Sequence, residues 1–136
     1  IDFILMINFF HNNLLKWKIL DAPENKGTCL VEIKVDETLA NVNKVIHGGA
    51  LASLVDLVTT MALFNTPGRK PGISVSINIS YIKPAKLDES ILVEGKVIKA
   101  GSKLAYLAAD IYLKDKDSKE LKKELLVATA THNKYI

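Results

Sequence analysis

The sequence predicts an α+β domain in which one long buried helix packs against a curved antiparallel sheet. Residues 48–64 are apolar on nearly every side, which is typical of a buried helix. The second half of the chain contains strand-like segments joined mostly by short turns, and consecutive strands joined in this way pair antiparallel. With 136 residues, 49% of them apolar, the chain is long enough to bury one core. We therefore expect a single domain over residues 1–136, with its core at 28–134.

Residues 1–20 are expected to form an N-terminal helical segment laid on this domain. The apolar run 3–10 within it is too short to span a bilayer and lacks the flanking residues of a signal peptide. No stable membrane insertion is therefore expected. Membrane contact through Phe9, Phe10 and Trp17 is the alternative to packing on the core.

The first core strand is predicted at residues 28–35, and a polar loop at 36–46 leads from it into the long helix. The segment His47-Gly48-Gly49 opens that helix. The cluster at 65–72 contains two Pro-Gly pairs, which end a helix and form a turn.

Residues 73–81 form the clearest strand in the sequence, because apolar and small polar residues alternate there with a period of two. Pro84 ends this strand. Further strands are expected at 90–99, 104–113 and 124–133, with a turn at Gly101-Ser102 and a solvated loop at 114–123. Long antiparallel strands that curl around one buried helix describe the hotdog fold.

Composition narrows the possible partners. The net charge is only +3, and every basic residue except Arg69 is Lys, whereas nucleic-acid binders more often show Arg clusters. Cys29 is the single cysteine, so no internal disulfide forms and no cysteine spacing predicts a metal site. This cysteine usage fits a reducing compartment. We expect no nucleic-acid partner and an intracellular protein, cytoplasmic or mitochondrial.

The long helix offers two chemical groups. The first N–H groups of a helix lack internal partners, so the amide of Gly48 or Gly49 can stabilise a developing oxyanion. Asp56 lies two turns inside the apolar helix, where a carboxylate is costly unless it is paired or used. It could act as a general base or as a nucleophile. The alternative is a structural Asp hydrogen-bonded to Ser53 or Thr60.

Several short motifs together resemble a known family. They are Asn41, His47-Gly48-Gly49, Leu54-Val55-Asp56, Thr60-Met61-Ala62-Leu63, Pro71-Gly72-Ile73-Ser74-Val75, Asn78-Ile79, Tyr81 and Pro84-Ala85-Lys86-Leu87. Over residues 28–134 the chain resembles the hotdog-fold acyl-CoA thioesterases of the phenylacetic-acid-degradation type. The first twenty residues match poorly, and the loop at 114–123 is longer than is usual for that family.

The resemblance implies hydrolysis of acyl-CoA, with a medium- or long-chain fatty acyl group, to free acid and CoA. It implies that Asp56 activates water, that the Gly48 amide polarises the thioester and that Asn41 contacts the thioester or the water. Ser74 would orient the water or Asp56, although it could equally be an ordinary strand serine. His47 would bind the carbonyl or, as we favour, brace the loop. No metal and no cofactor are expected, since CoA is part of the substrate.

The resemblance also implies a CoA site along two lysine-containing segments. These segments hold Tyr81, Lys83, Pro84, Ala85 and Lys86, then Lys99, Gly101, Ser102 and Lys103; Lys134 is expected just after the last strand. Lysines can bind phosphates as point charges, although a solvated lysine-rich face is the plain alternative.

The separation of the two catalytic groups predicts a dimer. Gly48 and Asp56 are about 12 Å apart along one helix, too far to act on one carbonyl. Two antiparallel helices related by a two-fold axis would bring them together in two equivalent shared sites. The resemblance implies the same dimer, paired again into a tetramer. Two other functions stay open: a noncatalytic acyl-CoA-binding or sensor module, and a hotdog hydratase or dehydratase.

Overall fold

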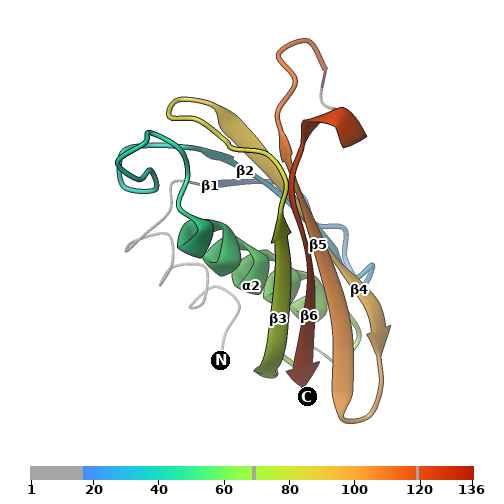
Figure 1. Ribbon diagram of the computed structural model, residues 1–136. Coiled ribbons are helices and arrows are strands. Elements are labelled where there is room, and N and C mark those ends of the chain that lie inside the picture. The colour runs from blue at the N-terminus through green and yellow to red at the C-terminus, as the bar shows by residue number, and fades with distance from the viewer. Residues whose placement is uncertain (1–16, 69, 119) are drawn as a thin grey trace.

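The computed structural model describes residues 17–68, 70–118 and 120–136. Within these ranges the chain forms six strands, one long helix and one short 3₁₀ helix (Figure 1). The elements are β1 (Trp17–Asp21), β2 (Thr28–Lys34), α2 (Gly48–Phe64), β3 (Ile73–Tyr81), β4 (Ser90–Ala100), β5 (Leu104–Leu113), η1 (Lys123–Leu125) and β6 (Leu126–Tyr135).

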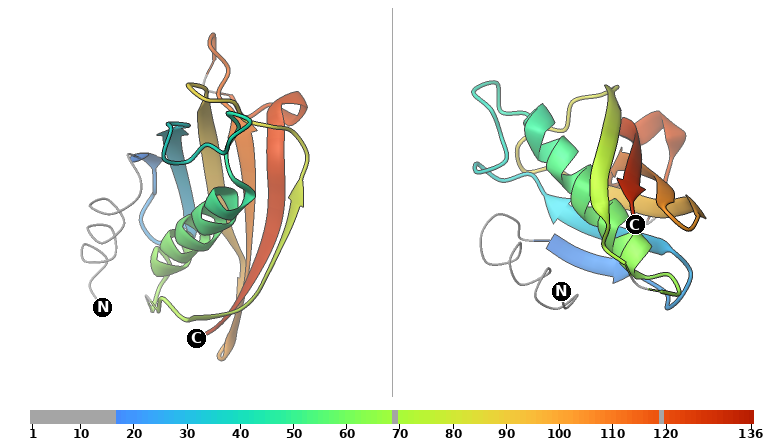
Figure 2. Two further views of the ribbon diagram at one scale, coloured as in Figure 1. Left: turned by 60° about the vertical axis from the view of Figure 1, so that its left-hand side comes forward. Right: turned by 90° about the horizontal axis from the view of Figure 1, so that it is seen from below.

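The strands form one antiparallel sheet in the order β1-β2-β4-β5-β6-β3. The sheet curls around α2, so that the helix lies along its concave face (Figures 1 and 2). This arrangement confirms the predicted curved antiparallel sheet around one long helix.

The prediction of a helix over residues 1–20 is wrong where the structure tests it. Residues 17–21 form β1, which pairs antiparallel with β2 and places Trp17 opposite Ile33. Pairing with the edge of β2 overrides the local helical pattern, because main-chain hydrogen bonds across the sheet depend on a partner distant in sequence. The rest of that prediction, residues 1–16, lies outside the described residues.

Close packing between α2 and β4 sets the position of the helix. A Cβ atom on Gly95 of β4 would lie 2.8 Å from the carbonyl oxygen of Val58, so only glycine lets the helix backbone approach this strand. Around this contact the buried face of α2 meets apolar side chains of the sheet. The core includes Leu54, Val55, Val58 and Met61 of the helix with Val31, Ile33, Val93 and Ile111 of the strands.

β3 lies at the edge of the sheet and pairs only with β6 among the described strands. Apolar side chains in its first half are exposed: Ile73 is 72% and Val75 is 62% exposed. An edge of nine residues with open main-chain groups and exposed apolar side chains can pair with another strand.

No helix in the described ranges is both long and apolar enough to cross a bilayer.

Candidate functional site

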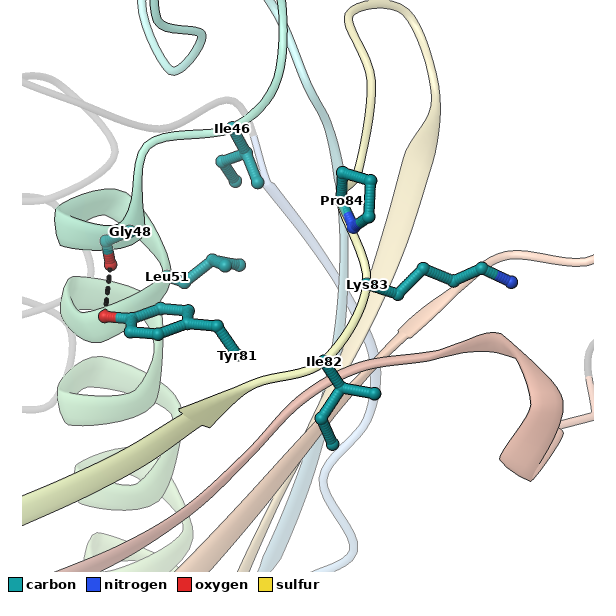
Figure 3. Close-up of a pocket in the computed structure, with 7 residues that line it drawn as sticks. All are labelled: Ile46, Gly48, Leu51, Tyr81, Ile82, Lys83 and Pro84. Atoms are coloured by element: carbon teal, nitrogen blue, oxygen red, sulfur yellow. Dashed lines mark hydrogen bonds between the residues drawn. The ribbon is translucent and has the colours of Figure 1, made fainter.

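The start of α2 is covered by Tyr81, the last residue of β3 (Figure 3). The Tyr81 hydroxyl donates a hydrogen bond to the Gly48 carbonyl oxygen at 3.1 Å. A Cβ atom on Gly48 would lie 3.3 Å from the tyrosine ring, so the ring packs closely on the glycine. His47 is the N-cap residue, and its side chain makes no capping hydrogen bond. The first amides of α2 are therefore donors without partners inside the helix.

A cavity of about 350 Å³ opens beside this helix start. It is lined by Ile46, Gly48, Leu51, Tyr81, Ile82, Lys83 and Pro84 (Figure 3). The Lys83 ammonium points away from Gly48 and donates a hydrogen bond to the carbonyl oxygen of Glu124 at 3.1 Å. The structure thus brings part of the predicted CoA segment to the predicted oxyanion-binding amide.

Asn41 shapes the loop that enters the helix. Its Oδ1 atom accepts hydrogen bonds from the backbone N–H groups of Asn43 (2.9 Å) and Val45 (3.3 Å). The loop is closed further by the His47 N–H, which donates to the Leu39 carbonyl at 2.8 Å. The His47 side chain is exposed and has no hydrogen bond within the described residues. In this protomer the Asp36 and Asn41 side chains brace the loop by accepting hydrogen bonds from its backbone N–H groups, and the His47 side chain does not.

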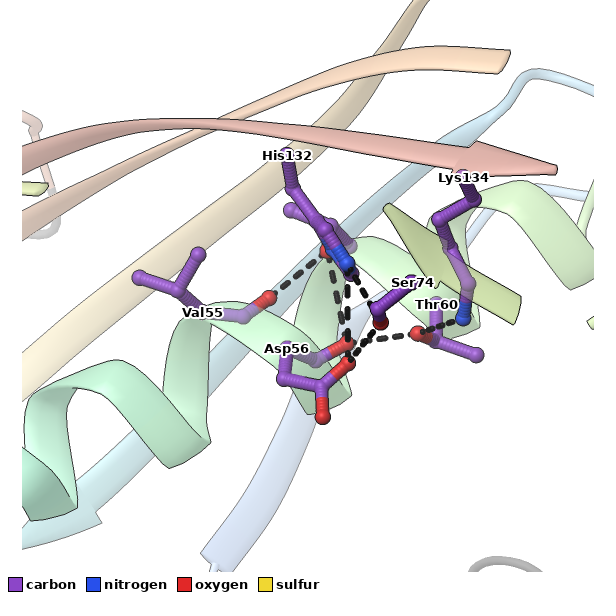
Figure 4. A network of polar contacts seen from close by, with 7 residues as sticks. Val55, Asp56, Thr60, Ser74, His132 and Lys134 are labelled. Carbon is purple, nitrogen blue, oxygen red and sulfur yellow. Dashed lines mark hydrogen bonds and ion pairs between the residues drawn. The ribbon is translucent and has the colours of Figure 1, made fainter. Parts of the chain in front are cut away.

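Asp56 lies in the middle of α2, facing Ser74 of β3 and His132 of β6 (Figure 4). Its carboxylate Oδ1 atom is 3.5 Å from Ser74 Oγ and 3.8 Å from His132 Nε2. The expectation of a buried carboxylate is wrong, because the Asp56 side chain is 49% exposed. The carboxylate faces β3, which is an edge strand, and no further described strand lies beyond β3 to cover it.

The structural alternative for Asp56 is not supported by its neighbours on the helix. The Ser53 hydroxyl donates to the Gly49 carbonyl at 2.9 Å, and the Thr60 hydroxyl donates to the backbone carbonyl of Asp56 at 2.6 Å. Neither hydroxyl bonds the Asp56 carboxylate. The carboxylate is therefore left facing Ser74, His132 and solvent.

His132 is a site residue that the sequence reasoning missed. The Thr59 hydroxyl donates its proton to the Val55 carbonyl at 2.7 Å, and His132 Nδ1 lies 2.7 Å from the same hydroxyl oxygen. His132 Nδ1 thus shares this hydroxyl with the Val55 carbonyl. The other ring nitrogen, Nε2, forms a hydrogen bond with the Ser74 hydroxyl at 2.8 Å. This chain of hydrogen bonds fixes the Ser74 oxygen beside Asp56.

The arrangement differs from a Ser-His-Asp nucleophilic triad. In such a triad the carboxylate binds the ring nitrogen that faces away from the serine. Here His132 Nδ1 binds Thr59, and Asp56 lies on the Nε2 side together with Ser74. The geometry therefore favours Ser74 as a group that holds a water molecule for Asp56.

Burial lowers the pKa of His132 below its ordinary value of 6.5, with an opposing effect from Asp56 and a smaller lowering effect from Lys134. The ring is completely buried, which favours the neutral imidazole. One signal in the sequence could have predicted the burial of His132. It follows Ala128 and Ala130 at a spacing of two residues, and these alanines face the core from β6.

Lys134 does not lie where the sequence predicted it. It belongs to β6 and does not follow it, and it is only 4% exposed. Its Nζ atom donates a hydrogen bond to Thr60 Oγ1 at 2.8 Å (Figure 4). The alternation of side chains along the strand explains this burial. Lys134 lies two residues after His132 in β6, so both side chains are on the same face of the strand and point toward α2. It joins the Asp56 cluster.

The other predicted CoA residues fall into two groups that one protomer keeps apart. Residues 81–86 lie at the start of α2, where Ala85 is buried and its carbonyl accepts the Ile46 N–H. Residues 99–103 comprise the last two residues of β4 and the exposed turn that leads from its far end into β5 (Figure 1). The 11 residues of β4 span about 33 Å. A single CoA site therefore cannot use both groups from one protomer in a compact pose.

Cys29 offers no thiol nucleophile. Burial, with a smaller contribution from Asp21, raises the pKa of this thiol to about 12. The thiolate is the reactive form, and it is absent at neutral pH. The chemistry available to the site consists of a carboxylate, a serine hydroxyl, an imidazole, a buried lysine amine and helix-terminal amides.

Comparison with known proteins places this chain in a family. Residues 43–119 match the Thioesterase superfamily. Acyl-coenzyme A thioesterase 13 from Homo sapiens is 37% identical over 127 residues, which cover 93% of this chain and 84% of the human protein. The chain belongs to the thioesterase superfamily. The prediction of a thioester hydrolase is thereby confirmed at the level of the family.

Solved structures agree with this assignment. Thioesterase superfamily member 2 from Mus musculus is 33% identical and superimposes with a TM-score of 0.80, covering 97% of this chain and 92% of the mouse chain. A hypothetical thioesterase from Streptococcus pneumoniae, crystallised with coenzyme A, has a TM-score of 0.79 at 22% identity, covering 95% of this chain and 94% of that one. The second likeness shows the shared fold.

His132 predicts a specific dependence of stability on pH. Because folding lowers the pKa of His132, the unfolded chain binds this proton more readily, and stability falls as the pH drops below the ordinary value of 6.5. We expect the drop in Tm between about pH 7.5 and about pH 5.5 to be smaller in His132→Gln than in the wild type. The exposed His47→Gln is the control and should keep the wild-type drop. Equal drops in all three proteins, measured by thermal denaturation, would contradict the neutral buried imidazole.

Proposed function

We propose that this protein hydrolyses acyl-CoA thioesters, with medium- or long-chain fatty acyl groups, to the free acid and CoA. The observation that carries the proposal is the Asp56 carboxylate beside the Ser74 hydroxyl, which is hydrogen-bonded to the buried His132. The similarity to acyl-coenzyme A thioesterase 13 supports the substrate class. No cofactor is needed, because water is the second reactant.

The proposed reaction uses Asp56 as a general base. A water molecule held by Ser74 Oγ and the Asp56 carboxylate loses a proton to Asp56 as its oxygen attacks the thioester carbonyl. The helix-terminal amide of Gly48 stabilises the resulting oxyanion, and the Asn41 side chain contacts the thioester or the water. The C–S bond then breaks, and the proton passes from Asp56 to the departing CoA thiolate.

One protomer cannot supply this whole constellation, so the proposal includes a dimer. Gly48 and Asp56 are about 12 Å apart along α2. Among the described strands β3 pairs only with β6, and its other edge suits two-fold antiparallel pairing with the same strand of a second copy. Such pairing sets the Ser74 end of one β3 beside the Tyr81 end of the other. Asp56 and Ser74 would then face Gly48 of the partner subunit.

The dimer would also reunite the two groups of predicted CoA residues. The turn at 99–103 lies at the Ser74 end of the sheet, because the Ile136 N–H donates to the Lys103 carbonyl and Lys134 pairs with Ser74. The segment 81–86 lies at the other end of β3. Two-fold pairing brings this segment from one protomer toward the turn of its partner, where lysines of both could bind phosphates.

We further propose that two such dimers pair into a tetramer. The outer face of the sheet carries exposed apolar side chains at Leu104 (40%), Tyr106 (44%) and Tyr135 (53%). Leu104 and Tyr135 are directly paired across β5 and β6. An exposed apolar patch of this kind favours association.

Asp56→Asn tests the reaction. The amide cannot accept the proton of water, so kcat should fall about 10²-fold or more, while KM changes little. The readout is thiol release from an acyl-CoA series of increasing chain length. Asp117→Asn, an exposed Asp in the loop after β5, is the matched control and should retain wild-type turnover. Near-normal turnover by Asp56→Asn would refute the role of Asp56 as the base. If the wild type binds acyl-CoA tightly but releases no thiol, the protein is instead a noncatalytic binding module.

Lys86→Ala and Lys103→Ala test the CoA site, one variant for each lysine group. Each should raise KM several-fold at low salt with little change in kcat, and the difference should shrink at high salt because exposed charges are screened. Lys26→Ala, in the exposed turn before β2, is the control. Unchanged KM in both variants at low salt would show that these lysines only solvate the surface.

Mixing two inactive variants tests the shared site. Asp56→Ala and Asn41→Ala damage the two halves of the proposed site, so a mixed dimer holds one intact site and one doubly damaged site. After subunit exchange, activity should return to about half of the wild-type value per mixed dimer. Each variant alone is the control. Absence of recovery after exchange verified by mass spectrometry, or a fully active monomer in sedimentation, would refute the shared site.

A further inference from the structure

Lys134 is a buried charged side chain that the proposed reaction does not yet use. It is 4% exposed, and lysines are rarely buried to this degree unless they are paired. It projects from the concave face of β6 toward α2, between Ser74 on β3 and Ala105 on β5 (Figure 4). A lysine in this place is sequestered from the surface where CoA phosphates would bind.

The Lys134 ammonium is linked to the helix turn that carries Asp56. Its Nζ atom donates to Thr60 Oγ1 at 2.8 Å, and the Thr60 hydroxyl donates to the Asp56 backbone carbonyl at 2.6 Å. No carboxylate of the described residues lies within 4.0 Å of Nζ, so the ammonium forms no direct ion pair there. Thr60 is the single group between the lysine and the Asp56 turn.

Few charges surround this lysine. On α2 the acidic group that acts on it is Asp56; on β6 the neighbouring titratable group is His132; and the β3 and β5 residues opposite it, Ser74 and Ala105, are uncharged. Burial lowers the pKa of Lys134, and Asp56 opposes that change. The attraction between Lys134 and Asp56 is therefore the main favourable charge interaction of the buried ammonium.

We propose that Lys134 is a positioning residue that keeps Asp56 ionised once substrate covers the site. This inference rests on the proposed function. In the free protomer Asp56 is 49% exposed, and water stabilises its carboxylate. An acyl chain and a partner subunit over the site would remove that water, and desolvation disfavours the charged form of a carboxylate. The Lys134 ammonium, held by Thr60 beside the Asp56 turn, replaces part of the stabilisation of the carboxylate charge that is lost when water leaves.

Because Lys134 acts in the substrate-bound enzyme, its replacement should change kcat more than KM. In Lys134→Met, the limb where kcat falls on the acid side should move to higher pH by about one unit, the lower end of the shift that a nearby opposite charge causes. On that limb kcat should be about tenfold below the wild type, and KM should stay within about twofold. The Tm should hold or rise, because methionine replaces a buried charge.

The experiment records kcat and KM for thiol release across pH with wild type, Lys134→Met, Lys134→Arg and Lys96→Met. Lys134→Arg keeps the charge and should return the acid limb toward the wild-type position. Lys96→Met is the matched control, since Lys96 is a partly buried lysine of β4 opposite Ala108, on the other face of the sheet. It should leave the profile unchanged.

Two results would overturn the inference. A raised KM with an unmoved acid limb would show that Lys134 binds the CoA phosphates. A lowered Tm with unmoved kcat and KM profiles would show a purely structural role. If Lys134→Met fails to fold, Thr60→Val removes the linking hydroxyl and should move the limb in the same direction; an unmoved limb there also overturns the inference. Failure of the proposed function is separate, since it would appear as an active Asp56→Asn variant.

Discussion

The approach of α2 to the sheet is the contact on which the rest of the structure depends. The helix backbone at Val58 lies so near β4 that a Cβ atom on Gly95 would be 2.8 Å from the carbonyl oxygen. With the helix held at that depth, the turn after Val55 meets the concave face of β6. The Thr59 hydroxyl can then bind His132, and through it Ser74 is held beside Asp56.

The same helix explains why the candidate site has two halves. One half, at the helix start, contains Gly48 under Tyr81 and the cavity beside it. The other half, two turns further on, contains Asp56 with Ser74 and His132. Because these halves are about 12 Å apart along one continuous helix, one protomer cannot bring both to one carbonyl. The exposed edge of β3 provides the surface through which the proposed two-fold pairing would join them.

The ionisable groups nearest to Asp56, in the second half of the site, come from β6. Alternation along this strand places Ala128, Ala130, His132 and Lys134 on the concave face, so the last two enter the space beside α2. Both are buried while Asp56 is half exposed. Burial opposes a charge on His132, and the hydrogen bonds of Thr59 and Ser74 fit the neutral ring. The half-exposed Asp56 carboxylate thus lies near two buried basic groups, His132 and Lys134, whose pKa values burial lowers.

Local patterns in the sequence were sufficient to determine the long helix, its start at His47-Gly48-Gly49, its end before Pro67, and the alternating strand at 73–81. These signals depend on neighbouring residues only: periodicity, unpaired helix amides and the residues that break helices. The unpaired helix amides and the carboxylate inside an apolar helix also pointed to Gly48 and Asp56, whereas Ser74 was indicated by the resemblance to a known family. Only the tertiary structure decided that residues 17–21 form a strand, since that depends on the free edge of β2. The burial of His132 and Lys134 and the exposure of Asp56 were decided in the same way. The burial of the two β6 side chains depends on contacts with Ser74 and Thr60, which lie 58 and 74 positions away in sequence, a range that periodicity and motif spacing do not reach.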